Sequence, residues 1–231
     1  QMNERTTTTI RAAFEKDIQI ILATGKTRAS GDWIIEKLGL KTPGIYMQGL
    51  IIYNPDGTIR HEQTLDADVA RQVITYADDR GFTVIAYSGT HILMKSVNDT
   101  GTKFSETYHE PAPEGIGPLQ NILGEMPVHK LMAIKSGDPR AIKALRWQLG
   151  MQLDETAKLV QAAIPDMLEI VPRGSSKGVA LRTLLREMDI DAANVLAIGD
   201  GENDIEMLQL AGIGVAGGNA SEELKAVADE I

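Results

Sequence analysis

The stretch Val195–Leu208 reads VLAIGDGENDIEML, and it decides the fold class that the sequence predicts. Its first four residues are apolar, which is typical of a strand buried on both faces, as in a parallel sheet. Gly199 ends this strand, and apolar residues return at helical spacing from Ile205. The stretch therefore predicts a strand, an acidic turn and a helix. Such a turn lies at the carboxyl edge of the sheet, where open α/β sheets bind their ligands.

Acidic and amide side chains fill the predicted turn: Asp200, Glu202, Asn203 and Asp204. A hard cation prefers oxygen ligands, so the turn is a candidate cation site. In the alternative interpretation Asp200 caps the helix and the other acids complement the helix dipole, which accounts for one or two acids more easily than for the whole cluster. An EF-hand is excluded, because its sixth and twelfth positions hold Ile205 and Ala211 instead of Gly and Glu.

Strands and helices alternate at both ends of the chain. Residues 3–47 are predicted to form helix, strand, helix and strand, and the same alternation returns over residues 175–228. Between them, residues 50–171 contain strand pairs separated by helices, beginning with a hairpin around Asn54–Gly57. The sequence thus predicts an α/β domain with a parallel sheet that is interrupted by an α+β domain.

Composition and charge exclude several classes of protein. The chain has 231 residues, a net charge of -9 and no cysteine. The negative charge argues against a general nucleic-acid or anionic-membrane surface, although a local cation site can still attract a phosphorylated substrate. The absence of cysteine excludes a thiolate nucleophile and a cysteine-based zinc site. No apolar run approaches the roughly 20 residues that span a bilayer.

One glycine-rich segment matches a known fingerprint but not its context. Gly212–Gly217 reads GIGVAG, which fits the dinucleotide-binding pattern. That pattern should follow a strand and begin a helix, whereas this segment follows a predicted helix and contains its own strand. Nicotinamide binding is therefore not expected.

Two further segments are expected at the same sheet edge as the acidic turn. Thr24–Gly25 follows the predicted strand Ile18–Ala23 and starts a helix, so its hydroxyl and backbone N–H groups are suited to hold a phosphate; an ordinary N-cap is the alternative. Lys177, in the segment Ser176–Gly178, lies in the first turn of a predicted helix. Its charge opposes the helix dipole there unless it meets an anion, and a solvated lysine is the alternative.

Together these segments resemble the motifs of the haloacid dehalogenase (HAD) superfamily, specifically its Cof-type phosphatases with a large inserted cap. The matches are Ala23–Gly25, Ser176–Gly178, and Gly199–Asp200 with Asn203–Asp204. The resemblance implies a Rossmann-like core formed by residues 1–48 and 172–231, and an α+β cap of the C2 type formed by residues 49–171. It also implies a magnesium-dependent phosphatase that hydrolyses a small phosphorylated metabolite (a sugar phosphate, a nucleotide or a cofactor phosphate) through an aspartyl-phosphate.

The resemblance assigns roles to individual residues. Thr24, Lys177 and Asp200 would be catalytic, since phosphoryl transfer depends on positioning and charge neutralisation. Asp200 would bind Mg²⁺, and Asp204 would support the metal directly or through its ligands. The residues that would contact the substrate are Thr24, Gly25, Lys177 and Asn203.

The chain departs from the family in its first motif, Asp-x-Asp-Gly-Thr, which is absent from the sequence. The Asp66–Asp68 and Asp189–Asp191 pairs are predicted to lie in a cap helix and in a loop, so they do not replace it. We therefore expect the nucleophile to lie before Gln1 and the chain by itself to be inactive. The alternative is a non-catalytic homologue that binds a phosphorylated ligand or another protein. The family's usual Asn-Gly also reads Gln48–Gly49 here, which puts that substrate contact in doubt.

The expected partner is a small phosphorylated metabolite, with no nucleic acid and no membrane. The expected compartment is the cytoplasm, or an organelle if a targeting segment has been removed. The sequence does not determine the oligomeric state.

Overall fold

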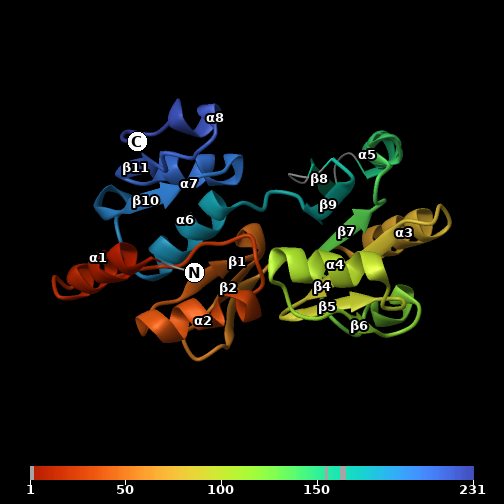
Figure 1. Cartoon of the computed structure of the whole chain (residues 1–231), viewed down its shortest axis with the longest axis horizontal. Coiled ribbons are helices and arrows are strands. Elements are labelled where there is room, and N and C mark those ends of the chain that lie inside the picture. Colours follow the sequence, from red (N-terminus) through yellow and green to blue (C-terminus); the bar gives the residue numbers. More distant parts are fainter. Residues whose placement is uncertain (1–2, 154–155, 162–164) are drawn as a thin grey trace. The chain divides into compact units, whose positions relative to one another are not determined.

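The chain is described by a computed structural model that covers residues 3–153, 156–161 and 165–231. Its contacts divide it into two units (Figure 1). The first comprises residues 1–26, 31–62 and 175–231, and the second comprises residues 27–30 and 63–174. Among the described residues, no helix combines the length and apolar character needed to cross a membrane.

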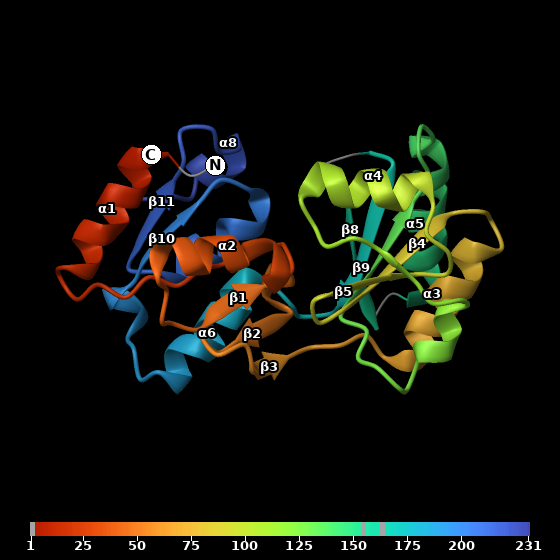
Figure 2. The ribbon, with the colours of Figure 1, turned by 60° about the horizontal axis from the view of Figure 1, so that its bottom comes forward.

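The first unit is built from both ends of the chain, as the colours of Figure 2 show. Its helices are α1 (Glu4–Phe14), α2 (Arg28–Leu38, whose first residues fall in the second unit), η1 (Met47–Gly49), α6 (Lys177–Glu187), η3 (Ala192–Asn194), η4 (Glu202–Asp204), α7 (Ile205–Leu210) and α8 (Glu222–Lys225). Its strands are β1 (Gly44–Tyr46), β2 (Ile51–Tyr53), β3 (Ile59–Glu62), β10 (Leu196–Gly199) and β11 (Ile213–Ala216).

Two sheets organise this unit. Strands β10 and β11 pair in parallel, and β1, β2 and β3 form an antiparallel sheet. Because β2 pairs with β1, residues 49–62 fall in the first unit, whereas they were expected in the inserted domain. Residues 172–174 fall in the second unit, whereas they were expected in the core. The strand expected over Ile18–Ala23 is reduced to one parallel bridge between Ala23 and Ile45.

The expected strand at the start of the acidic turn is present as β10, but it is not buried on both faces. Ala197 is 6% exposed, because α6 and α7 cover its face of the strand. Leu196 and Ile198 on the other face are 55% and 67% exposed. Among the described residues, β10 pairs only with β11 and is therefore an edge strand. The prediction of burial was wrong, because four apolar residues do not show whether both faces are covered.

The second unit is an α+β domain. Its helices are α3 (Ala67–Asp78), α4 (Asp99–Tyr108), η2 (Leu119–Ile122) and α5 (Pro139–Leu153). Its strands are β4 (Thr83–Ser88), β5 (His91–Met94), β6 (Glu114–Gly115), β7 (Lys130–Ile134), β8 (Ala157–Gln161) and β9 (Met167–Pro172). They form one sheet in the order β6-β5-β4-β7-β9-β8, antiparallel except between β5 and β6. Neither α4 nor β6 was predicted from the sequence.

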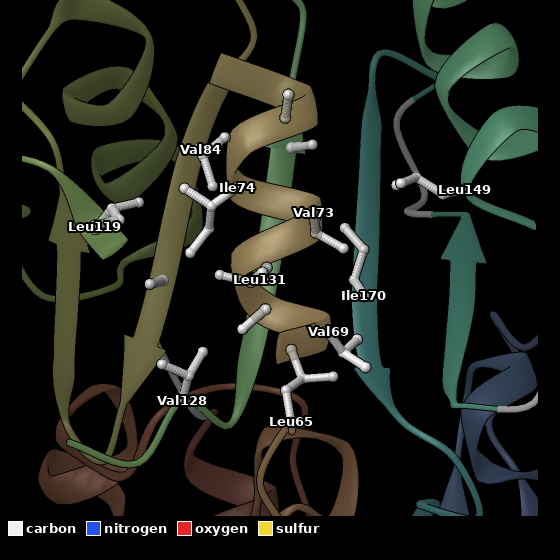
Figure 3. Packing of buried hydrophobic residues seen from close by; sticks show 14 of the residues in the cluster. Leu65, Val69, Val73, Ile74, Val84, Leu119, Val128, Leu131, Leu149 and Ile170 are labelled. Carbon is white, nitrogen blue, oxygen red and sulfur yellow. The ribbon is translucent and has the colours of Figure 1, made fainter. Parts of the chain in front are cut away.

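One face of this sheet carries the core of the second unit. Figure 3 shows Val73 and Ile74 of α3 packed over strand residues that include Val84 and Leu131. Helix α5 contributes buried residues to the same cluster. Because side chains alternate along a strand, the residues next to Val84 and Leu131 point to the opposite face.

Candidate functional site

The acidic turn after β10 is folded around the side chain of Asp204. Its Oδ1 accepts a hydrogen bond from the ammonium of Lys177 at 2.7 Å, and its Oδ2 accepts from the backbone N–H groups of Asp200 and Gly201, both at 3.1 Å. The side chains of Lys177 and Asp204 are 7% and 5% exposed. Gly199 lies against the Asp204 side chain so closely that a Cβ at this position would collide with it. Both carboxylate oxygens of Asp204 are therefore engaged within the turn.

Asp200 presents the more open carboxylate. The residue is exposed, and its Oδ2 accepts a hydrogen bond from Nδ2 of Asn219 at 3.1 Å. Its backbone carbonyl accepts from the N–H of Ser221 at 3.3 Å. Within the described part of the chain, no hydrogen-bond donor contacts Oδ1 of Asp200. That oxygen is free to meet a cation.

The position of Lys177 follows from the start of α6. Ser176 is the N-cap, and its Oγ accepts a hydrogen bond from the N–H of Val179 at 3.1 Å. Lys177 is then the first helical residue, where a positive charge is unfavourable next to the helix dipole. The carboxylate of Asp204 offsets this effect. The expectation that Lys177 meets an anion is thus met by a residue of the chain itself.

Thr24 is joined to the acidic turn through Gln48. The Thr24 hydroxyl accepts a hydrogen bond from the N–H of Lys26 at 3.2 Å, and its carbonyl accepts from the N–H of Gln48 at 3.2 Å. The side chain of Gln48 then accepts from Nδ2 of Asn203 at 2.5 Å. Gln48 has a φ of 61°, an unusual value for a residue with a side chain.

Gly49, the residue after Gln48, packs against the start of α6. Gly49 has a φ of 96° and lies against the carbonyl of Ser176, in a space that a Cβ would fill. This close approach places the Gln48–Gly49 segment beside the start of α6. The structure therefore brings the predicted site residues Thr24, Lys177, Asp200, Asn203 and Asp204 into one connected set within the first unit, and Gly25 lies beside the Gln48 side chain.

Two members of this network were not predicted. Gln48 was expected to put the family's substrate contact in doubt, and no role was predicted for Asn219. A signal for Asn219 exists: it follows β11, and β11 is the parallel neighbour of β10. Residues that follow neighbouring parallel strands meet at the same sheet edge.

The donor set fits a hard cation only in part. Among the described residues, no three Asp, Glu, His or Cys side chains are grouped closely enough to hold a metal ion. The Asp200 carboxylate is the kind of oxygen ligand that Mg²⁺ prefers, whereas Asp204 is occupied by Lys177 and two N–H groups. Asp200 is thus suited to bind the ion, and Asp204 to shape the turn that presents Asp200.

The profile of the haloacid dehalogenase-like hydrolases matches residues 1–231. The chain belongs to this family. It is 30% identical over 225 residues to the HMP-PP phosphatase of Enterobacter sp. (strain 638), a match that covers 97% of the chain and 80% of that relative. It is 32% identical over 240 residues to the chloroplastic endoribonuclease YBEY of Arabidopsis thaliana, covering 100% of the chain but only 41% of the relative's length.

A solved structure from the same family has the same fold. It is a haloacid dehalogenase-like hydrolase from Bacteroides thetaiotaomicron, which superposes with a TM-score of 0.90 at 25% identity. The match covers 100% of this chain and 87% of that one. The predicted fold class, a Rossmann-like α/β core with an inserted α+β domain, is confirmed, and so is the resemblance on which it rested.

Proposed function

We propose that the site in the first unit belongs to a magnesium-dependent phosphatase that hydrolyses a small phosphorylated metabolite. The observation that carries this proposal is the Lys177–Asp204 pair beside the open carboxylate of Asp200. It combines a fixed positive charge with an oxygen ligand for a cation, which are two of the parts that phosphoryl transfer requires. Family membership and the name of the Enterobacter relative support the same class of reaction.

Each side chain has a distinct role in this proposal. The Thr24 hydroxyl, whose oxygen accepts from the N–H of Lys26, donates its own proton to a phosphoryl oxygen. Lys177 neutralises negative charge at the reacting carboxylate and the phosphate. Asn203, fixed by Gln48, orients the substrate phosphate. Bound Mg²⁺ would be held by Asp200, and it would supply charge neutralisation at the phosphoryl group.

We further propose that the nucleophilic aspartate lies outside this sequence, on a strand that pairs with the open edge of β10. The sequence has no Asp-x-Asp-Gly-Thr. The exposed Leu196 and Ile198 on β10 are consistent with a further element covering that region. One aspartate of the missing motif would attack phosphorus as the bond to the leaving oxygen breaks, and the second aspartate of that motif would give the leaving oxygen its proton. Water would then hydrolyse the aspartyl-phosphate.

We propose a class of substrate and not a single compound. A sugar phosphate, a nucleotide and a cofactor phosphate all fit a site that holds a phosphoryl group. The activity named for the Arabidopsis relative is not transferred, since this chain spans 41% of that protein and has a net charge of -9. The compartment, cytoplasm or organelle, stays a prediction.

The decisive experiment adds a strand carrying Asp-x-Asp-Gly-Thr before Gln1 and measures Mg²⁺-dependent hydrolysis of p-nitrophenyl phosphate. We expect turnover in the extended protein and none in the chain as it stands. Asp200→Asn in the extended protein should reduce turnover by at least about a hundredfold, the scale of losing one electrostatic contact to the transition state. Glu202→Gln is the matched control, because it neutralises an exposed acid of the same turn. Equal losses in the two variants would refute the metal role of Asp200.

A non-catalytic phosphate-binding protein is the second candidate, and the absence of the nucleophile motif favours it. It predicts that the extended protein binds inorganic phosphate without hydrolysing any ester. Calorimetric titration with phosphate, run beside the hydrolysis assay, separates the two functions.

A further inference from the structure

Helix α5 of the second unit exposes a row of residues with large apolar side chains (Figure 1). Arg140, Ala144, Trp147 and Met151 follow one another at spacings of four, three and four residues, so they share one side of the helix. Trp147 is 66% exposed and Met151 is 70% exposed, and the other two residues are exposed as well. The opposite side of α5 is buried in the core of the second unit. We refer to these four residues as the α5 face.

The neighbouring helix α3 covers the same side of the sheet but exposes an ordinary polar surface. The two helices are joined by a hydrogen bond from Nε2 of Gln72 to Oε1 of Gln152, at 2.9 Å. The exposed residues of α3 carry both signs of charge and include no large apolar side chain: Asp68, Arg71, Gln72 and Thr75. Single exposed apolar residues are common, but Trp147 and Met151 lie one turn apart and form a continuous patch. An apolar patch of this kind indicates a surface that is covered by a partner.

The charges of α5 are distributed against its helix dipole. Its cations are Arg140, Lys143 and Arg146, it contains no acid, and no cation lies in its last turn. Positive charge is unfavourable at the start of a helix and favourable at its end. Asp138 offsets part of this effect, because its Oδ1 accepts a hydrogen bond from the N–H of Ala141 at 2.9 Å. The first half of α5 is therefore positive, whereas its last turn presents the negative end of the dipole.

The α5 face is complementary to itself when two copies lie antiparallel. A spacing of four, three and four residues is the same in both directions, so an antiparallel copy meets it in register. A two-fold axis between Ala144 and Trp147 places Trp147 of each copy over Ala144 of the other, and Arg140 beside Met151. Large residues then face small ones, as close helix packing requires. The positive first half of each helix also lies beside the negative end of the other.

We propose that the α5 face is the interface through which two copies of this chain associate. A parallel pair of helices would bring the cations of both copies together, and a net charge of -9 argues against nucleic acid or an anionic membrane as the partner. A contact between two single helices is smaller than the roughly 800 Å² per partner of stable complexes, so we expect a weak dimer. The proposal is independent of the proposed phosphatase activity, because α5 contains none of the site residues.

The test is sedimentation velocity of the full chain over a series of concentrations, where we expect a reversible monomer–dimer equilibrium. Trp147→Ser should raise the dissociation constant of the dimer at least about tenfold, because a central aromatic residue dominates such an interface. Trp33→Ser is the matched control: Trp33 is 47% exposed on α2 and should not affect association. Melting temperatures, recorded at the lowest concentration, should stay unchanged in both variants, since both side chains are exposed.

A second pair of variants tests the charges. Arg140→Glu combined with Lys143→Glu should also raise the dissociation constant at least about tenfold, because two negative charges then face the negative end of the other helix. Lys37→Glu combined with Lys41→Glu changes the net charge equally at exposed residues of the first unit, and it should have a much smaller effect.

Cross-linking tests the orientation, because the chain has no cysteine of its own. Arg140→Cys and Met151→Cys proteins are mixed and oxidised with copper–phenanthroline. Antiparallel packing brings position 140 of one copy beside position 151 of the other, so the mixed disulfide should form in preference to either symmetric one.

Four results would overturn the proposal. They are a chain that stays monomeric at its highest soluble concentration, equal effects of Trp33→Ser and Trp147→Ser on association, equal effects of the two charge-reversed pairs, and a predominance of symmetric disulfides. Vesicles of phosphatidylglycerol are titrated separately and are not expected to bind. If the monomeric chain bound them and Trp147→Ser abolished that binding, the α5 face would belong to a membrane contact instead.

Discussion

The ammonium of Lys177 lies 2.7 Å from Oδ1 of Asp204, and both side chains are almost completely buried. Lys177 is the first residue of α6, and Asp204 ends the acidic turn after β10. This pair therefore holds the start of a helix against a turn that is 27 residues away in sequence. Stability of the first unit and geometry of the candidate site depend on the same contact.

Breaking this pair should destabilise the first unit strongly. Lys177→Met leaves the Asp204 carboxylate buried without its ammonium partner, and we expect a loss of about 3–5 kcal/mol in the free energy of unfolding. Lys177→Met combined with Asp204→Asn should recover part of that loss, because no isolated charge remains. Urea unfolding is followed by the fluorescence of Trp33, with Trp147 replaced by Phe, so that the signal reports on the first unit.

The control for this experiment is Lys225→Met. Lys225 pairs with Glu222, whose side chain is 87% exposed. An exposed pair of this kind contributes about 0–1 kcal/mol. Equal losses of unfolding free energy in Lys177→Met and Lys225→Met would show that the buried pair stabilises the protein no more than the exposed pair.

The close approach of Gly49 to Ser176 should make Gly49 intolerant of substitution. Gly49→Ala places a Cβ against the Ser176 carbonyl at a φ of 96°, whereas Gly39→Ala meets no atom within 4 Å at a φ of 63°. We expect Gly39→Ala to cost about 1–2 kcal/mol from backbone strain alone. Gly49→Ala should cost about 1–3 kcal/mol more, the usual effect of overpacking. Urea unfolding followed by Trp33 fluorescence measures both variants. Similar losses of unfolding free energy in Gly49→Ala and Gly39→Ala would show that contact with the Ser176 carbonyl adds no cost.

Tyr87 should make stability fall at alkaline pH. Burial, and then the charges of Glu110 and Glu169, raise its pKa well above 10. The unfolded chain loses this proton near pH 10 while the folded protein keeps it, so the folded state binds more protons above that pH. The contribution is thus fully present below pH 10 and is lost as pH rises further. Tyr87→Phe should flatten the decline of melting temperature above pH 10, and Tyr76→Phe is the control. Parallel declines in all three proteins would contradict this prediction.

Local patterns predicted most helices and most strands, whereas contacts between distant segments had no local signal. The N-cap Asn3, the hairpin at Asn54–Gly57 and the strand–turn–helix after Val195 depend on neighbouring residues, so the sequence contains their signals. The bond between Asn203 and Gln48 joins residues 155 positions apart and left no local signal. Helix α4 was missed because its sequence, DTGTKFSETY, is polar and contains a glycine in its first turns.

The exposure of β10 also depends on distant segments. An apolar run predicts a strand, but the elements that cover it come from elsewhere. Leu196 on the open face is 55% exposed, whereas Leu208, which packs against the covered side, is 1% exposed. In the chain as it stands, Leu196→Ala should therefore cost less than about 1 kcal/mol, and Leu208→Ala about 2–5 kcal/mol.

Adding a strand that carries Asp-x-Asp-Gly-Thr before Gln1 should raise the loss of unfolding free energy caused by Leu196→Ala. It should leave the loss caused by Leu208→Ala unchanged. If the added strand pairs with β10 and orders the elements around it, Leu196 becomes part of a core, and Leu196→Ala should then cost at least about 2 kcal/mol. Urea unfolding of both variants, with and without the added strand, measures the difference. An unchanged free-energy cost of Leu196→Ala would mean that no element comes to cover this face of β10 when the strand is added, which would contradict the expectation that the strand completes the sheet beside β10.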